Sequence, residues 1–325
     1  MDHVRLGNTG LKVSRFCLGM DNFGDPQLRK WAADYDAGRP LVAEAVEAGI
    51  NFFDTADAYS LGHSEVLTGR FTKEFFTRRE EYVVATKVYN PMGEAPNERG
   101  LSRRHILTSV DNSLSRLDLD YIDVYFLHRW DYDTPIEETM EALNDVVRAG
   151  KVCYIAASSM WAWQFAKAQY ISEMNGWPRF IAMENHYNLL YREEEREMIP
   201  LLHDQGVSSV PYSPLARGLL ARAGEGEEVG TLRSQTDVLI DERYPTVNQD
   251  VLRDLAYVSS ERGDAPAQVA LAWLLSQPTV ASPIIGVTKS KHLHEAVSSL
   301  SLELSDEEVE KLEGSYRTQP VSGHY

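Results

Sequence analysis

Seven apolar, β-rich segments recur along this chain, and stretches with the apolar spacing of helices lie between them. The helical stretches include 41–49, 103–117 and 135–150. Helices of about 10–15 residues between strands predict βαβ units and a parallel sheet. The segments end at Asp54, Lys87, His128, Ser158 and Ser159, 184–186, Tyr212 and Ser213, and Gly286. Mainly polar groups at the strand ends predict an α/β protein, a (β/α)8 TIM barrel with its active site at the carboxyl face.

The length of the chain fits one barrel domain over 1–325. A barrel takes about 250 residues, or more with insertions, and this chain has 325. Two short alternating segments around a Gly-Asn-Thr-Gly turn predict an N-terminal β-hairpin over 3–13, ahead of a first barrel strand at 15–18. The hairpin could plug the amino end of the barrel. The segment 216–248 lacks periodicity, which predicts a long loop over the site after strand seven.

Composition argues against several classes of protein. The net charge of −17 argues against a nucleic-acid partner. The sequence contains no stretch of about 18 apolar residues, so it predicts no membrane span. The first ten residues lack the order of a signal peptide, so we expect a cytoplasmic enzyme. Cys17 and Cys153 lie in predicted strands and are expected to be buried thiols. There is no obvious cluster of metal ligands, and the sequence leaves the oligomeric state open.

Four ionisable residues carry the chemistry that the strand ends suggest: Asp54, Tyr59, Lys87 and His128. Each one alone has an ordinary structural explanation, as a turn residue, a rim charge or a loop histidine. Three of them stand at the ends of neighbouring strands two, three and four, and Tyr59 follows five residues after Asp54. In a barrel these side chains converge at one face.

Together these groups suit proton transfer to a carbonyl oxygen. A tyrosine with a pKa near about 10 is protonated at neutral pH and can donate, and a nearby ammonium lowers that pKa. A carboxylate beside the lysine keeps the lysine charged, and a histidine can orient the carbonyl by a hydrogen bond. The set contains no hydride and no strong nucleophile. A separate hydride donor is therefore needed, which implies a nicotinamide cofactor.

The segments around these residues resemble the aldo-keto reductase superfamily. They are FFDTADAYSLGHSE, ATKV at Lys87, YFLHRW at His128, AASS at 156–159, YSPLARG at 212–218 and IIGVTKSKHLHEA at 284–296. The similarity runs from about residue 3 to 313. HRWDYDTPIEETMEALNDVVRAGKV and NHYNLLYREEEREMIPL are most similar to the bacterial and fungal aryl-alcohol-dehydrogenase-like branch.

This resemblance implies NADPH-dependent reduction of a small-molecule aldehyde or ketone, with NADH also possible. It makes Tyr59 the general acid, Lys87 and Asp54 its tuning pair, and His128 the residue that orients the carbonyl. The matched cofactor positions are Ser158, Ser159 and Glu184 at the nicotinamide carboxamide, Tyr212 stacked on its ring, Ser213, Leu215, Arg217 and Gly218 along the pyrophosphate, and Gly286, Thr288, Lys289, His292 and Glu295 at the adenosine end. The absence of a GxGxxG fingerprint agrees with this assignment.

Two positions depart from the family pattern. Glu184 stands where a glutamine is usual, and its charge would favour NADP⁺ over NADPH. In the alternative, Glu184 pairs with a base such as Arg217 and has no electrostatic effect on the cofactor. At the adenosine end, His292 and Ala296 replace the usual residues, so recognition of a 2′-phosphate rests largely on Lys289.

Two aromatic residues, Tyr89 and Trp130, lie directly beyond Lys87 and His128. They suggest a substrate pocket for a flat aromatic or apolar carbonyl compound. Two other functions stay open: a cofactor-binding redox-sensing or regulatory subunit with little turnover, and a non-redox sugar-phosphate enzyme on the same barrel. Turnover of a simple aldehyde distinguishes the first alternative from the reductase.

Overall fold

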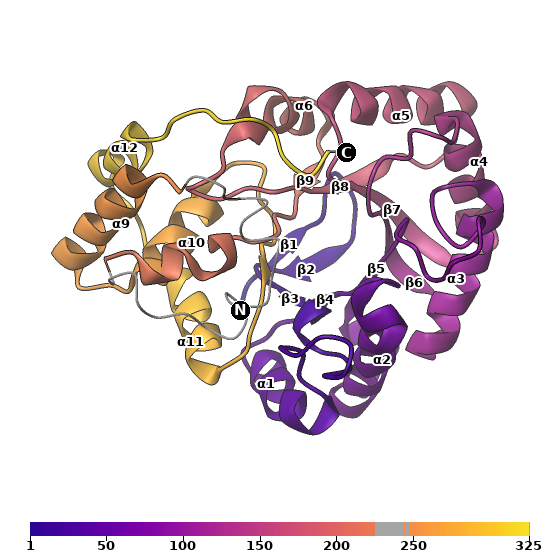
Figure 1. The fold of residues 1–325 in the computed structure, drawn as a ribbon, viewed down its shortest axis with the longest axis horizontal. Helices are drawn as coiled ribbons and strands as arrows, with labels where there is room; N and C mark the ends of the chain where they lie inside the picture. Colours follow the sequence, from indigo (N-terminus) through magenta and orange to yellow (C-terminus); the bar gives the residue numbers. More distant parts are fainter. Residues whose placement is uncertain (225–243, 245–246, 325) are drawn as a thin grey trace.

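A closed parallel sheet forms the centre of the protein. The computed structural model describes residues 1–224, 244 and 247–324. The sheet has eight strands in the order β10-β3-β4-β5-β6-β7-β8-β9. Their bounds are β3 Cys17–Gly19, β4 Phe52–Asp54, β5 Val83–Val88, β6 Ile122–Leu127, β7 Val152–Ser158, β8 Phe180–Glu184, β9 Ser208–Ser209 and β10 Ile284–Ile285. Figure 1 shows helices around these strands, which confirms the predicted α/β barrel.

Backbone hydrogen bonds close the barrel between β9 and the chain around β10. The Ser209 N–H donates to Thr279 O at 2.8 Å, and the Ala281 N–H donates to Ser209 O at 2.9 Å. The Ile284 N–H donates to Pro211 O at 2.8 Å. The carboxyl ends of all eight strands therefore surround one opening.

The helices pack on the outside of the barrel through apolar faces. In α4, Ile136, Met140, Leu143 and Val146 recur every three or four residues and are buried. The helices are α1 Tyr35–Glu47, α2 His63–Phe75, α3 Arg103–Leu117, α4 Ile136–Arg148, α5 Ala162–Asn175, α6 Met198–Gln205, α9 Gln249–Arg262, α10 Pro266–Ser276, α11 Ser290–Ser299 and α12 Asp306–Gly314. None of the helices in the described ranges is long and apolar enough to cross a membrane.

The predicted N-terminal hairpin is present and packs into the amino end of the barrel. Its strands β1 His3–Arg5 and β2 Lys12–Ser14 pair antiparallel. Leu6 and Val13 are fully buried in a cluster with residues from the starts of the barrel strands, such as Phe52. This packing closes the end of the barrel opposite the predicted site.

Gly7 fixes the docking of the hairpin, and we expect Gly7→Ala to destabilise the fold by roughly 1–3 kcal/mol. Gly7 has φ +61°, and a Cβ there would lie 2.3 Å from Ile181 O. Gly10→Ala, in the same turn, is the matched control because nothing lies within 4 Å of its added Cβ. Urea unfolding of both variants measures the difference. Equal stabilities would contradict this account of the docking.

Two expectations need correction or restriction. Cys17 is buried as predicted, but Cys153 is exposed. Cys153 is the second residue of β7, before the part of the strand that is fully enclosed. The segment after β9 contains short 3-10 turns, η5 Ala216–Gly218 and η6 Leu220–Arg222. The centre of the predicted long loop, 225–243 and 245–246, lies outside the described residues.

Candidate active site

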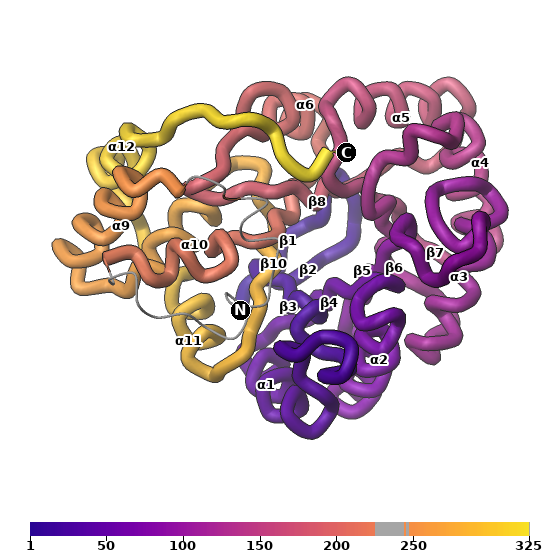
Figure 2. The backbone as a smooth tube through the Cα atoms, in the orientation of Figure 1, coloured from indigo at the N-terminus to yellow at the C-terminus, as the bar shows by residue number. Residues whose placement is uncertain are grey.

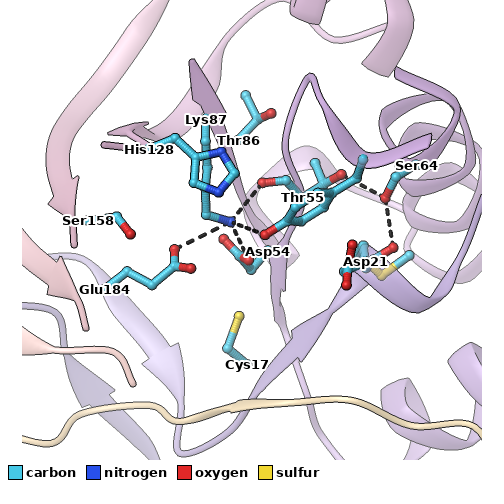
Figure 3. Close-up of polar contacts among 12 residues, drawn as sticks. Cys17, Asp21, Asp54, Thr55, Ser64, Thr86, Lys87, His128, Ser158 and Glu184 are labelled. Atoms are coloured by element: carbon cyan, nitrogen blue, oxygen red, sulfur yellow. Dashed lines mark hydrogen bonds and ion pairs between the residues drawn. The ribbon is translucent and has the colours of Figure 1, made fainter. Parts of the chain in front are cut away.

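Successive strands of the sheet bring the four predicted catalytic residues to one end of the barrel. Asp54 is the last residue of β4, Lys87 lies near the end of β5, and His128 directly follows β6. Tyr59 begins the short 3-10 turn η2 Tyr59–Gly62 that follows β4. The barrel topology alone therefore places side chains from distant parts of the chain in contact (Figure 3).

The Lys87 ammonium is the centre of this cluster. Its Nζ lies 2.5 Å from Asp54 Oδ2, 3.3 Å from the Tyr59 hydroxyl and 3.3 Å from Glu184 Oε2. It also donates to the Thr55 carbonyl oxygen at 3.0 Å. Lys87 is fully buried, and a buried charge of this kind requires such partners.

Burial and the neighbouring charges alter the acidity of these groups. Burial alone would lower the pKa of Lys87, but Asp54 and Glu184 raise it well above its usual value. Burial also raises the pKa of Tyr59, against the opposing effect of Lys87. The lowering of the tyrosine pKa expected from the lysine is therefore outweighed by desolvation. At neutral pH the cluster combines a protonated phenol with a charged ammonium.

Glu184 is a second buried carboxyl group at Lys87, with 3% of its surface exposed. Burial and the charge of Asp54 raise the pKa of Glu184 to about 8, although Lys87 opposes the increase. Figure 3 shows Glu184 and Asp54 on two sides of Lys87. The base that Glu184 contacts here is Lys87, whereas the sequence suggested Arg217 as an alternative.

His128 is oriented by Asn90, a residue that the sequence analysis missed. The Asn90 amide Nδ2 lies 3.0 Å from His128 Nδ1. An amide nitrogen can only donate, so Nδ1 accepts and the ring proton lies on Nε2. The Tyr59 and His128 rings meet edge to face, with centroids 5.8 Å apart. The imidazole N–H and the phenol can therefore reach the same small group.

The loop that carries Tyr59 has an unusual backbone. Ser60 and Leu61 have φ of 48° and 50°, in the left-handed region. Close packing holds this turn, since a Cβ at Gly24 would lie 2.2 Å from Ser60 Oγ. Thr55 donates to Ser64 Oγ at 2.9 Å and connects the loop to α2. Such backbone conformations cost about 1–3 kcal/mol each and gather at functional sites.

The ends of β7 and β9 place the predicted nicotinamide-binding residues together. Ser158 and Ser159 are buried, and Ser159 Oγ lies 3.1 Å from the Tyr212 hydroxyl. Tyr212 stacks on His186 with ring centroids 5.4 Å apart. Ser159 and Ser213 have φ of 46° and 51°, which marks both turns as conformationally special.

The predicted pyrophosphate-binding residues lie in the turn after β9. Ala216, Arg217 and Gly218 all have positive φ, at 47°, 56° and 95°. Leu215, Arg217 and Gly218 are partly exposed. Turns of this kind can direct backbone N–H groups toward a bound anion.

The predicted adenosine-binding residues lie between β10 and the start of α11. Lys289 is exposed and stands at the N-cap position of α11 without a capping hydrogen bond from its side chain, and Gly286 and Thr288 are exposed just before it. His292 Nδ1 lies 3.3 Å from Thr288 Oγ1. Glu295 lies 3.4 Å from Lys291, so its carboxylate already has a cationic neighbour. A cation at a helix amino end suits a phosphate group.

Aromatic and C-terminal residues surround the opening. Trp130 is buried, and Tyr89 is partly buried. The tail 315–324, which carries no strong sequence pattern, crosses toward this end of the barrel (Figure 2). The Tyr132 hydroxyl donates to the His324 carbonyl oxygen at 3.1 Å. This contact joins the tail to the loop after β6, and no local sequence signal predicts it.

An arginine on the loop after β3 also lies against the catalytic tyrosine. The Arg29 guanidinium lies 5.7 Å from the Tyr59 ring centroid and 5.4 Å from that of Trp31. Arg29 forms an ion pair with Asp21. The sequence gave no motif for this contact, because it depends on how a long loop folds back over η2.

Comparisons with known proteins agree with this geometry. The pattern of the Aldo/keto reductase family matches residues 15–317. The chain is 42% identical to versiconal hemiacetal acetate reductase from Aspergillus parasiticus, over 97% of each chain. It is 38% identical to a putative aryl-alcohol dehydrogenase from Schizosaccharomyces pombe, over 98% of this chain and 96% of that one. The chain belongs to the aldo-keto reductase family.

Family membership establishes the class of chemistry. The chain is an oxidoreductase that acts on carbonyl groups, in a family that uses small carbonyl substrates and generally NAD(P)H. Among the described residues, no group of three or more His, Cys, Asp or Glu side chains could hold a metal ion.

Proposed function

We propose that this chain reduces aldehydes or ketones to alcohols with NADPH, and that Tyr59 is the general acid. The observation that carries the proposal is the position of Lys87 Nζ, 2.5 Å from Asp54 and 3.3 Å from the Tyr59 hydroxyl. A fixed ammonium beside a phenol stabilises the phenolate that forms when the phenol gives up its proton.

Each residue of the cluster has one part in the mechanism. His128 holds the carbonyl oxygen through Nε2–H and fixes its angle. Tyr59 donates its proton to that oxygen as negative charge develops there. Lys87 stabilises the resulting phenolate, and Asp54 keeps Lys87 in place. A bound nicotinamide supplies the hydride for the carbonyl carbon.

The residues at the ends of β7 and β9 fit a nicotinamide. Ser158 and Ser159 offer buried hydroxyl groups for a carboxamide, and Tyr212 offers a flat ring. Ser213, Leu215, Arg217 and Gly218 would follow the pyrophosphate, and the residues from Gly286 to Glu295 would hold the adenosine. Tyr89 and Trp130 would face the substrate, which favours an aromatic or apolar carbonyl compound.

NADPH and NADH consumption against a panel of aromatic, aliphatic and sugar aldehydes tests the proposal. We expect turnover with aromatic aldehydes and a preference for NADPH. Cofactor binding without turnover of any aldehyde would instead favour the redox-sensing alternative. Absence of cofactor binding would contradict both of these functions.

We expect Lys289→Ala to weaken NADPH binding about tenfold and to leave NADH binding nearly unchanged. Lys289 stands at the N-cap position of α11, where a 2′-phosphate would accept a charge-assisted hydrogen bond from its ammonium. A tenfold loss corresponds to about 1.4 kcal/mol. Fluorescence titration with both cofactors measures the effect.

Lys291→Ala is the matched control for that experiment. Lys291 lies on the same helix, is also exposed and pairs with Glu295. The Lys291→Ala substitution removes one positive charge, as Lys289→Ala does, but keeps Lys289 at the start of α11. Equal losses of NADPH affinity in the two variants, or equal losses for both cofactors in Lys289→Ala, would show that Lys289 does not recognise the phosphate.

A further inference from the structure

We propose that Glu184 stores the proton that carbonyl reduction consumes, and that Lys87 passes this proton from Glu184 to Tyr59. The inference rests on the proposed function, because it assigns a second proton-carrying group to the same reaction. It goes beyond an electrostatic effect of Glu184 on the cofactor. Glu184 loses its proton in each reduction and regains one before the next.

Lys87 contacts both ends of this path, and more oxygen atoms surround its ammonium than it has N–H groups. Four oxygen atoms lie within 3.3 Å of Nζ, from Asp54, Thr55, Tyr59 and Glu184. An ammonium has three N–H donors. The two shorter contacts, to Asp54 and to the Thr55 carbonyl, take two of them. The third N–H donates to Tyr59. Glu184 Oε2 lies 3.3 Å from Nζ and has no hydrogen-bond partner among the described residues, so it is in reach of Lys87 once Lys87 has given a proton to Tyr59.

The relay is enclosed by the barrel. Lys87 is fully buried and Glu184 is 3% exposed, so the path between Glu184 and Tyr59 is shielded from bulk water, and Glu184 regains its proton from solvent between turnovers. A proton held on Glu184 is therefore available to Tyr59 through one buried nitrogen. This placement distinguishes Glu184 from surface carboxylates, whose protons are lost to solvent at neutral pH.

Charged and titratable groups from several strands act on Glu184. Burial and Asp54 on β4 favour its protonated form, while Lys87 on β5 and Arg129 after β6 favour the carboxylate. The thiol of Cys17 on β3 is also close enough to interact with Glu184: burial, Asp54 and Glu184 together raise the pKa of this thiol. With the pKa of Glu184 at about 8, most of the molecules carry this proton at pH 7.

The proton transfers balance. Tyr59 gives its proton to the carbonyl oxygen, so the phenol O–H bond breaks as the alcohol O–H bond forms. Lys87 protonates the Tyr59 oxygen and takes the proton of Glu184, which ends as a carboxylate. The hydride from the nicotinamide brings two electrons to the carbonyl carbon, so the cofactor is oxidised and the carbonyl is reduced. The carboxylate left on Glu184 would stabilise the positive charge of an oxidised ring bound at the ends of β7 and β9.

Proton release on cofactor binding tests the inference without turnover. NADP⁺ or NADPH is added at saturation to the protein in weak buffer at pH 7 with a pH indicator. Because both forms share the 2′-phosphate, its titration cancels in the difference. We expect NADP⁺ to release about 0.5–1 proton per chain more than NADPH, since a positive ring lowers the pKa of Glu184. Glu184→Gln, which is neutral and similar in shape, should abolish the difference.

The same measurement separates the ways in which the inference can fail. Equal release with both cofactors in the wild type overturns the inference and leaves reduction by NADPH intact. A difference that persists in Glu184→Gln also overturns it, because the proton then comes from another group. Failure of both cofactors to bind overturns the proposed function and the inference with it. The wild-type comparison is decisive even if the variant does not fold.

A pH dependence of affinity follows with a defined sign. Ionised Glu184 binds the positive ring better, so the Kd for NADP⁺ in the wild type should fall as pH rises toward about 8, by at most about tenfold per pH unit. The Kd for NADPH should not follow this trend, because its ring is neutral. In Glu184→Gln both cofactors should show the same pH dependence, and a retained difference in slope would contradict the relay.

Discussion

Tyr59→Phe should lower kcat for aldehyde reduction roughly 10²–10⁴-fold, the range that general acid catalysis contributes. The substitution removes only the hydroxyl that lies 3.3 Å from Lys87 Nζ. The ring keeps its edge-to-face contact with His128 and its contact with Arg29, so the loop should hold its position. Lys87 retains Asp54 and Glu184 as partners. NADPH affinity should therefore stay within about twofold of the wild type.

Steady-state kinetics with an aromatic aldehyde and fluorescence titration with NADPH check this result. Tyr170→Phe is the control, because it makes the same chemical change at an exposed residue of α5. Activity of Tyr59→Phe within a few-fold of the wild type, with equal cofactor binding, would remove Tyr59 from the role of general acid.

The sequence predicted the positions of the site residues better than their charge states. Asp54, Lys87 and His128 could be placed because parallel strands bring their carboxyl ends to one face. The effect of burial on Tyr59 could not be predicted from residue types. It depends on how completely the barrel and its loops exclude water, and here desolvation outweighs the ammonium.

The sequence patterns could not predict contacts between distant loops. Asn90 fixes the tautomer of His128, yet asparagine after a strand is an ordinary turn residue. The tail contact of His324 with Tyr132 joins residues 192 positions apart. The exposure of Cys153 was mispredicted because an apolar segment does not show where enclosure of its strand begins. Periodicity describes single elements, whereas these features depend on how the elements meet.

Lys87→Met should reduce activity at least as much as Tyr59→Phe and should also destabilise the fold. It removes the cation that lies between two buried carboxyl groups, Asp54 and Glu184. Breaking a buried ion pair on one side costs about 3–5 kcal/mol, unless the remaining groups bind protons. The loss of activity reflects the missing support for the Tyr59 phenolate. The loss of stability reflects the buried Asp54 carboxylate, which is left without its cation.

The pH dependence of unfolding separates these two losses. Burial already raises the pKa of Asp54 and Glu184 in the wild type, against the opposing effect of Lys87. Without Lys87 both values rise further, so the native variant binds still more protons than the unfolded chain and its stability depends on pH more steeply than that of the wild type. The free energy of unfolding of Lys87→Met should therefore decrease as pH rises from about 5 to 8, by up to about 1.4 kcal/mol per pH unit for each proton. Urea unfolding across this range measures the slope.

The double variant Lys87→Met with Asp54→Asn, which removes one carboxylate, should recover much of the stability and none of the activity. Recovery of activity in the double variant, or a slope equal to that of the wild type, would show that Lys87 does not hold the charge balance of the site.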